Sequence, residues 1–532
     1  MGRFSLTTSQ IDLRKIILEK ISTSATLGGM WNRTVWLVWL LVLPLALILG
    51  YLLATPDDLM SFGAVGLVLF ILAIPLLLKW HYPLLIFSWN AVLVPFFLPG
   101  HPDLWMLMVL ISLAISVLRR TVDRDATFLK ASSVTLPLLF LGAVVVLTAK
   151  FSGGIGLSAL GSATYGGRKY LYIFAAILGF FALTAQSIPK ERAKLYTILF
   201  FVSGLTAVVS NLAYMGGPGF YFLFLLFPVE GALGQAAATQ SIGDSVIRIG
   251  GLISGCLAVY CALLAHNGIR EIFNIRRPWK MALFLLASFA SLLAGFRSAV
   301  IILTLVFVLV FYFEGLHRTR LLPIFVIGAV FFAAVLFPFV SKMPFSVQRA
   351  LSVLPIKVDP VARADAEGSS QWRLEMWKII TPQVPQYFFK GKGYAIDPTD
   401  LYMTEHLSRL GLGSGSETAI LAGDYHNGPL SLIIPFGIFG VIGFVWFLAA
   451  SLRALYRNYR FGDPALRRVN AFLLAFFLAK AIFFFSIFGS LHSDLFVFIG
   501  LIGFSISLNG GIKGQSTVKV PVEPENVVPA LA

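Results

Sequence analysis

Charged residues are scarce in this chain, and their scarcity decides the class of protein. Only 12% of the 532 residues are Asp, Glu, Lys or Arg, while 58% are hydrophobic. The mean hydropathy is +0.85. A soluble fold does not need that much apolar sequence. The composition therefore excludes an ordinary soluble domain and predicts an all-α polytopic membrane protein.

Cysteine and the usual catalytic motifs are also lacking. Cys256 and Cys261 fall within one apolar run, where cysteine behaves as a small hydrophobic residue and provides neither a disulfide framework nor a zinc site. We find no Ser, His and acid arrangement and no phosphate-binding loop. No metal or cofactor is therefore expected. No cleavable signal peptide is expected either, because the first apolar run is long and lacks a small-residue cleavage pattern.

The charges that are present are unbalanced. There are 41 Lys and Arg against 25 Asp and Glu, which gives a formal net charge of +16. In a soluble chain this excess would suggest nucleic acid. Here the basic residues cluster in short loops between apolar runs, as is typical of cytoplasmic loops beside anionic lipid. We expect membrane lipids as partners and no nucleic acid.

Roughly fourteen apolar runs are long enough to cross a bilayer as helices. They cover approximately residues 34–53, 59–78, 83–98, 104–118, 133–149, 170–187, 195–215, 247–265, 281–295, 298–313, 321–340, 429–452, 469–488 and 491–508. Alternating the loops from a cytoplasmic N-terminus gathers basic pairs such as Arg119-Arg120 on one side. The loops on the other side are nearly free of basic residues. The apolar segment from Phe220 to Phe227 is a candidate for a re-entrant segment that enters the membrane without crossing it.

This orientation divides the chain into five segments and places both termini in the cytoplasm. Residues 1–30 form a polar arm. The sequence is equally consistent with an amphipathic helix on the membrane surface and with a disordered tail. Residues 31–340 form an N-terminal transmembrane bundle, 341–427 a large outward loop, 428–510 the C-terminal transmembrane helices and 511–532 a disordered cytoplasmic tail. The loop is too long for a mere connector, so we expect it to cap the membrane body.

The cap is expected to be partly helical. Trp372, Met376 and Ile380 share one face of a helix that Ser369 or Ser370 begins and Thr381-Pro382 ends. Within this helix, Arg373 is placed to stack on Trp377. The remaining expected elements of the cap are a turn at Lys390-Gly391-Lys392-Gly393-Tyr394, a helix over 400–410 and a short helix that Ser416 begins.

Several basic residues are candidates for an anion site at the outward face. Arg297 lies between two predicted spans on the outward side, where positive residues are depleted. This position favours a functional role for Arg297 over the alternative that its side chain merely extends from a helix end toward water. Arg373 on the cap helix and Arg248 at the start of a span also suit solvated structural charges. Guanidinium groups bind phosphate oxygens bidentately, so such a site needs no metal.

A histidine and a lysine complete the candidates. His426 precedes an apolar run in which Asn427 is the predicted N-cap and Pro429 a first-turn residue. The free N–H groups of that turn favour a neutral imidazole. The sequence fits two roles for His426 equally well, a catalytic base and a polar residue at the membrane interface without a catalytic role. Lys480 lies midway along an apolar span, where a charge must be paired or functional. Asp494 or His492 is its expected partner, and a structural ion pair and a role in binding the anion both remain open.

Short motifs occur in the order and spacing of a known family. They are Val246–Gly251, Gly295–Ala299, Trp372–Trp377 with Lys390–Tyr394, and His426-Asn427 with Gly437–Gly440. Together they resemble the O-antigen ligase and polymerase superfamily over residues 245 to 450. Gly428-Pro429 after the His-Asn pair and Phe296 before the arginine depart from the family pattern.

The resemblance implies a GT-C-like, metal-independent, inverting glycosyltransferase of the bacterial inner membrane. It would move a glycan from undecaprenyl diphosphate to a glycan or lipid acceptor during synthesis of lipopolysaccharide or another cell-surface polysaccharide. Arg297 and Arg373, and less directly Arg248, would bind the diphosphate, while His426 would assist the acceptor hydroxyl. Apart from the resemblance, the position of Lys480 makes it a further candidate for binding the diphosphate. The sequence does not separate a ligase from a polymerase.

Two other classes of function are alternatives to the transferase. A multi-pass transporter would usually carry acids at mid-membrane and show internal repeats. Here the spans are nearly devoid of acids, no repeat is seen, and the cations converge on the outer face. A non-catalytic lipid-binding scaffold would tolerate the loss of His426.

Overall fold

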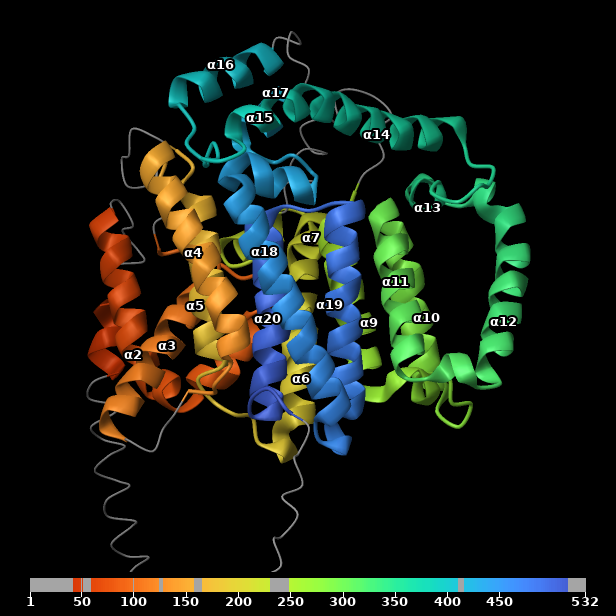
Figure 1. Cartoon of the computed structure of the whole chain (residues 1–532), viewed down its shortest axis with the longest axis horizontal. Helices are drawn as coiled ribbons and strands as arrows, with labels where there is room; N and C mark the ends of the chain where they lie inside the picture. Colours follow the sequence, from red (N-terminus) through yellow and green to blue (C-terminus); the bar gives the residue numbers. More distant parts are fainter. Residues whose placement is uncertain are drawn as a thin grey trace, which may run out of the picture. The chain divides into compact units, whose positions relative to one another are not determined.

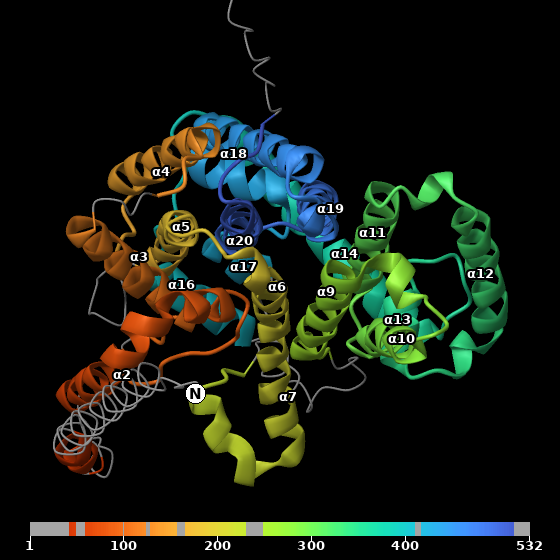
Figure 2. The same ribbon diagram turned by 90° about the horizontal axis from the view of Figure 1, so that it is seen from below.

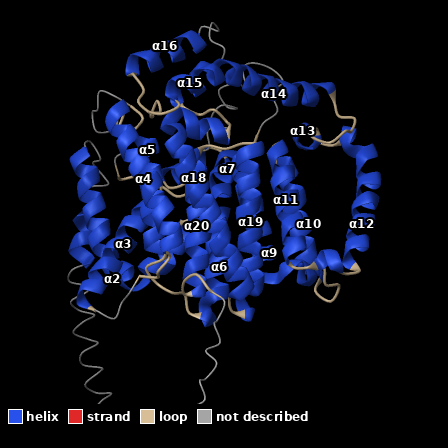
Figure 3. Ribbon diagram, viewed as in Figure 1, coloured by secondary structure: helices blue, strands red, loops and turns tan. Residues whose placement is uncertain are grey.

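The computed structural model describes residues 42–48, 50, 59–98, 100–123, 128–156, 165–229, 248–409 and 416–514. The chain splits into two compact units, one of Met1–Lys79 with Phe97–Pro99 and one of Trp80–Phe96 with Gly100–Ala532. Every regular element in the described ranges is a helix (Figure 3). Tyr165 and Ile396 form an isolated antiparallel bridge. The predicted all-α fold class is confirmed.

The helices follow one another along the chain with short connections. The α-helices are α2 (Leu59–Ser88), α3 (Leu104–Val122), α4 (Ser132–Ser152), α5 (Gly167–Leu183), α6 (Ala193–Val202), α7 (Ala207–Gly216), α9 (Gly250–Ile272), α10 (Pro278–Leu293), α11 (Arg297–Phe313), α12 (Leu321–Leu336), α13 (Phe345–Leu351), α14 (Pro360–Ile380), α15 (Val384–Tyr387), α16 (Pro398–Arg409), α17 (Ser416–Ala422), α18 (Gly428–Phe461), α19 (Arg467–Ser486) and α20 (Leu491–Asn509). The 3-10 helices are η2 (Lys190–Arg192), η3 (Ser203–Thr206), η4 (Pro218–Leu225), η5 (Leu316–Arg318), η6 (Phe337–Lys342), η7 (Thr381–Gln383) and η8 (Pro464–Leu466).

Within the described ranges, nine helices are long and apolar enough to cross a membrane, and α10 and α11 are shorter apolar helices. The predicted multi-pass membrane protein is thereby confirmed. The expected span over 34–53, the arm over 1–30 and most of the tail over 511–532 lie outside the described residues. The apolar piece after α7 is largely the 3-10 helix η4.

The separate spans predicted over 59–78 and 83–98 are wrong. Helix α2 continues without a break to Ser88, and residues 91–95 have no helical structure. The polar residues near position 80 suggested a loop, but His81 is buried, and its Nδ1 lies 2.9 Å from the Ser112 hydroxyl. A polar side chain that finds a partner inside the protein does not end a helix. Backbone N–H groups of the non-helical residues 91–95 find hydrogen-bond acceptors elsewhere in the protein. Val92 N–H donates to the Thr206 hydroxyl, and Val94 N–H donates to the Leu226 carbonyl.

The core of the second unit is built around α19 and α20, which are the most buried membrane spans described. Helix α20 packs most extensively on α5, α18 packs on α4, and α10 packs on α9. Figures 1 and 2 show α18, α19 and α20 side by side. Buried amides tie these three helices together at one end, since Asn470 Nδ2 donates to the Asn458 carbonyl and to Asn509 Oδ1 at 3.0 Å. Paired amides in an apolar layer fix the register of the helices.

The cap consists of helices α13 to α17, and Figure 1 shows α14 lying across the ends of α11 and α19. Asp359 caps α14 by accepting from Val361 N–H at 2.8 Å, so the predicted start at Ser369 or Ser370 is wrong. Asp359 followed by Pro360 is a stronger start signal than a serine, because proline suits the first helical position. The predicted end at Thr381 and the predicted helix start at Ser416 agree with the structure, whereas the helix predicted over 400–410 begins two residues earlier, at Pro398.

A break in α18 anchors the cap to the membrane bundle. Gly437 has non-helical backbone angles, with φ 63°, inside α18. The break leaves carbonyls of the preceding turn free, and the predicted Lys-Gly-Lys-Gly turn uses them. Lys392 N–H donates to the Ile434 carbonyl at 2.7 Å, and Gly393 N–H donates to the Pro435 carbonyl at 2.9 Å. A Cβ atom at Gly391 would lie 2.2 Å from the Pro435 carbonyl oxygen, so this turn requires glycine there.

Candidate functional site

Two of the predicted arginines meet on helix α14. Arg297 is the first residue of α11, and its Nη2 donates to the Ser370 hydroxyl on α14 at 2.9 Å. Arg373 lies one turn farther along α14, half-buried. Burial lowers the pKa of Arg373, and the nearby charges of Arg297, Arg248 and Arg349 lower it further. The four guanidinium groups therefore act on one another, although each stays protonated because arginine is so basic.

Asp365 is a shared counter-ion for two members of this arginine cluster, which we define as Arg248, Arg297, Arg349 and Arg373. Arg248 Nη2 lies 3.5 Å from Asp365 Oδ2. Arg349, which is 3% exposed, pairs with the same oxygen through Nε and donates through Nη1 to the Gly295 carbonyl. The cluster thus holds a surplus of positive charge in a poorly hydrated place, and such a surplus attracts an anion strongly.

His426 is held in a strained conformation beside this cluster. Its φ is 51°, a left-handed value that is rare for a residue with a side chain and that often marks a functional site. Its Nδ1 lies 2.9 Å from the Asp424 carbonyl oxygen. A carbonyl only accepts, so Nδ1 carries the hydrogen and Nε2 is the nitrogen with a free lone pair.

Aromatic rings connect His426 with the arginines. The imidazole lies edge to face with Trp372 at 5.3 Å and with Phe488 at 5.1 Å between ring centroids. The Arg373 guanidinium carbon lies 5.9 Å from the centroid of the same Phe488 ring. Burial lowers the pKa of His426, and the hydrogen bond to the Asp424 carbonyl opposes this shift only in part. The imidazole is therefore neutral near pH 7 and able to accept a proton.

The stacking of Arg373 on Trp377 that the sequence predicted is wrong. The Trp377 indole N–H instead donates to the Tyr425 carbonyl at 2.8 Å, which ties α14 to the residue before His426. The helix start after His426 agrees with the prediction, since the Asn427 side chain accepts from Leu430 N–H at 3.0 Å and Pro429 lies in the first turn.

The departure from the family pattern at Gly428 has a structural explanation. A Cβ atom at this position would lie 2.2 Å from the Phe484 carbonyl oxygen, and one at Gly489 would lie 2.8 Å from the Gly428 Cα. The two glycines let the start of α18 approach the connection between α19 and α20. This approach places Phe488 against both His426 and Arg373.

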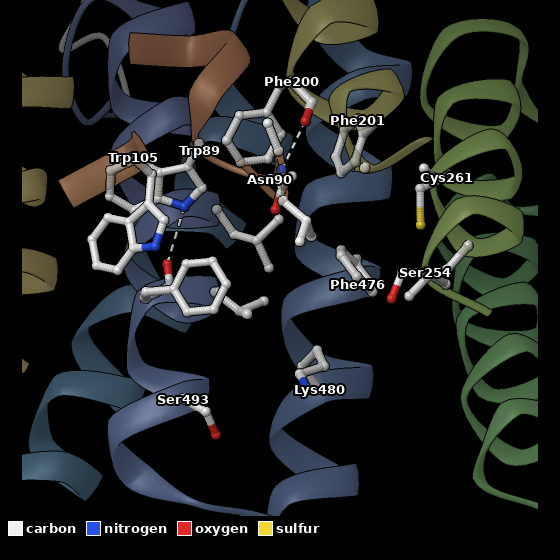
Figure 4. A pocket seen from close by; sticks show the side chains of 18 of the residues that line it. Trp89, Asn90, Trp105, Phe200, Phe201, Ser254, Cys261, Phe476, Lys480 and Ser493 are labelled. Atoms are coloured by element: carbon white, nitrogen blue, oxygen red, sulfur yellow. Dashed lines mark hydrogen bonds between the residues drawn. The ribbon is translucent and has the colours of Figure 1, made fainter. Parts of the chain in front are cut away.

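Lys480 occupies a different environment. Its Nζ lies 2.8 Å from Asp494 Oδ1, and Asp494 Oδ2 accepts from Ser490 N–H at 2.9 Å. Asp494 is thus the partner, while His492 Nδ1 lies 3.0 Å from the Ser490 hydroxyl. Lys480 borders a mostly apolar cavity of about 380 Å³ whose wall, as far as the described residues show, includes no member of the arginine cluster (Figure 4).

Replacing Lys480 with methionine is expected to destabilise the protein by about 3–5 kcal/mol, because it leaves a buried carboxylate without its cation. Thermal unfolding in detergent measures the effect. The double variant Lys480→Met, Asp494→Asn removes the orphaned charge and keeps an acceptor for Ser490 N–H, so it should recover most of the loss. An unchanged unfolding temperature in the single variant would show that the ion pair does not stabilise the fold.

Sequence reasoning missed Arg349, Asp365 and Lys169. The Nζ of Lys169, on α5, lies 2.7 Å from Asp424 Oδ1. A signal for Lys169 existed, because it stands on the side of the predicted topology where lysine is depleted, as Arg297 does. Within the described ranges, no group of three or more His, Cys, Asp or Glu side chains is placed to hold a metal ion.

Comparison with known proteins identifies the region that carries this site. No curated protein matches the chain. A family model described as O-Antigen ligase matches residues 282–445. The matched region contains Arg297, Arg349, Arg373 and His426, whereas Lys169, Arg248 and Lys480 lie outside it. The resemblance found in the sequence is thereby confirmed over residues 282–445, which match the O-antigen ligase family model.

Proposed function

We propose that this protein is an O-antigen ligase-type glycosyltransferase that moves a glycan from undecaprenyl diphosphate to a glycan or lipid acceptor. The observation that carries this proposal is that Arg297 and His426 both lie beside helix α14, which carries Arg373. In this proposal the cap faces outward from the bacterial inner membrane, and both termini are cytoplasmic.

The arginine cluster is the proposed binding site for the diphosphate. The bond between the anomeric carbon and the diphosphate oxygen breaks in the reaction, and the diphosphate leaves with the electron pair. Fixed guanidinium groups in a poorly hydrated site stabilise the negative charge that develops there. Four arginines against the Asp365 carboxylate leave enough positive charge for such a leaving group without a metal ion.

His426 is the proposed base. The acceptor hydroxyl attacks the anomeric carbon from the face opposite the diphosphate, so the configuration inverts, and its proton passes to His426 Nε2. The hydrogen bond from Nδ1 to the Asp424 carbonyl supports this role, because it orients the ring and keeps Nε2 unprotonated. Trp372 and Phe488 hold the ring from its sides.

A polymerase of the same superfamily would use the same groups and differ in its acceptor, which would be another lipid-linked repeat unit. A multi-pass transporter is the rival from another class. The transferase is favoured because the strained imidazole and the arginine cluster lie together where the cap meets the membrane helices. A transporter would instead be expected to depend on polar groups at mid-membrane.

The test is glycan transfer by the purified protein in liposomes, with undecaprenyl diphosphate glycan as donor and candidate lipid and glycan acceptors. We expect transfer that persists in EDTA, with one glycan added per acceptor for a ligase and a ladder of products for a polymerase. Absence of any transfer, together with movement of the lipid-linked glycan or of an ion across the bilayer, would reject the transferase in favour of a transporter.

A further inference from the structure

The turn that carries His426 is held by a lysine from outside the region that matches the family. Lys169 belongs to the first turn of α5, more than 250 residues earlier in the chain. Its Nζ donates to the Asp424 carboxylate at 2.7 Å and to the Ala422 carbonyl at 2.5 Å. It also lies 5.4 Å from the centroid of the Tyr394 ring. The Lys169 side chain is 16% exposed and the Asp424 side chain is 39% exposed, so water reaches the ion pair mainly from the side of the carboxylate.

The contacts of Lys169 lead directly to the imidazole. Asp424 binds Lys169 through its carboxylate and His426 Nδ1 through its carbonyl. The turn is tight, since Asp424 N–H donates to the Ala419 carbonyl at 2.8 Å, and Gly423 has a φ of 73°. A displacement of Asp424 would therefore move the carbonyl that sets the tautomer and direction of His426.

The start of α5 is itself fixed to the cap. The Tyr170 hydroxyl accepts from Tyr394 N–H at 2.9 Å. Tyr165 and Ile396 exchange two backbone hydrogen bonds of 3.1 Å. A Cβ atom at Gly166 would lie 1.8 Å from the Tyr394 carbonyl oxygen, so the two segments touch backbone to backbone. Lys169 thus projects from a rigid base, as a group that positions another must.

We propose that Lys169 is a positioning residue for His426, which acts by binding both Asp424 and the Ala422 carbonyl and so holds the turn in which Nδ1–H is bonded and Nε2 is free. This inference rests on the proposed transferase function and adds to it a part of the site that α5 supplies. Lys169 does not touch the reacting atoms. It acts through Asp424.

The charges around His426 give this proposal a distinctive signature. The charged groups that face the imidazole are Arg373 from α14, Lys169 from α5 and Asp424 from its own turn. Arg373 and Lys169 lower the pKa of His426, whereas Asp424 raises it. Loss of the Lys169 charge should therefore move the acid limb of the rate profile to higher pH, and loss of the Asp424 charge should move it to lower pH. A residue that merely stabilised the fold would not produce opposite shifts.

The experiment compares Lys169→Met, Lys169→Arg and Asp424→Asn with the natural protein in the liposome assay. In Lys169→Met we expect kcat to fall by about 10- to 100-fold with little change in KM, because misplacing a catalytic group costs that much. Lys169→Arg keeps the charge and the donors, so it should retain most of the rate. Lys280→Met is the matched control, since Lys280 is also buried and lies 3.4 Å from a carboxylate of Glu271, away from the cap.

Hydrogen exchange of the peptide around residues 419–427 provides a second readout that does not need activity. Exchange should rise in Lys169→Met and not in Lys169→Arg or Lys280→Met. The proposal is overturned if Lys169→Met transfers glycan at the natural rate, if both charge-removing variants shift the pH profile in the same direction, or if exchange of the turn is unchanged. Absence of transfer by the natural protein would instead refute the transferase function itself.

Discussion

Replacing His426 with alanine is expected to lower glycan transfer by about 10²- to 10⁴-fold, the usual contribution of a positioned general base. The fold and the binding of the lipid-linked donor should persist. Neither the arginine cluster nor the hydrogen bond by which the Asn427 side chain begins α18 depends on the imidazole. The measurement is the rate of transfer in liposomes, paired with donor binding and thermal unfolding.

The control for this variant is His406→Ala. His406 lies exposed on α16, also in the cap, and stacks on Tyr402. Its loss should leave transfer unchanged. The natural protein should keep its rate down to a pH below the ordinary pKa of histidine, because burial lowers the pKa of His426 and the neutral form is the base. Full activity of His426→Ala would remove this residue from the mechanism.

Replacing Arg297 with lysine is expected to lower kcat by about 10²- to 10³-fold, the range found when one fixed donor to a developing charge is lost. Lysine keeps the positive charge but lacks the planar fork that binds two phosphate oxygens while it also reaches the Ser370 hydroxyl. Single-turnover transfer at saturating donor separates this effect from weaker binding.

Arg363→Lys is the matched control for that variant. Arg363 also lies on α14, but it is exposed and donates to the Ile356 carbonyl at 2.8 Å. Its change should be nearly silent in the transfer assay. If Arg297→Lys were equally silent, charge alone would suffice, and the bidentate hold on the diphosphate would be wrong.

The parts of the site that the sequence predicted are those with a local signal. Arg297 stood out because a positive residue is unusual between two spans on that side, and Asn427 with Pro429 has the composition of a helix start. Arg349 gave no such signal, because its partners, the Gly295 carbonyl and Asp365, come together only through the fold. The same reason explains why the partners of Lys169 could not be predicted.

The errors in the fold have a similar origin. Helix α2 was divided in two because Lys79 was assigned to a loop between two spans, whereas the helix continues through the neighbouring His81, which is buried beside its distant partner Ser112. Helix α14 was given too late a start because Ser369 or Ser370 was assigned as its cap and the earlier signal at Asp359 was overlooked. Local propensity is a weak guide wherever a residue far along the chain supplies the missing partner.

The break in α18 at Gly437 limits how the cap can move. Two carbonyls of the broken turn serve the backbone of the cap at Lys392 and Gly393. Lifting the cap away from the bundle would strip both acceptors of their donors beside the apolar core, at a cost of about 1–3 kcal/mol each. The cap is therefore held firmly at this turn, and under the proposed transferase function we expect donor and acceptor to enter beside the turn rather than by lifting it.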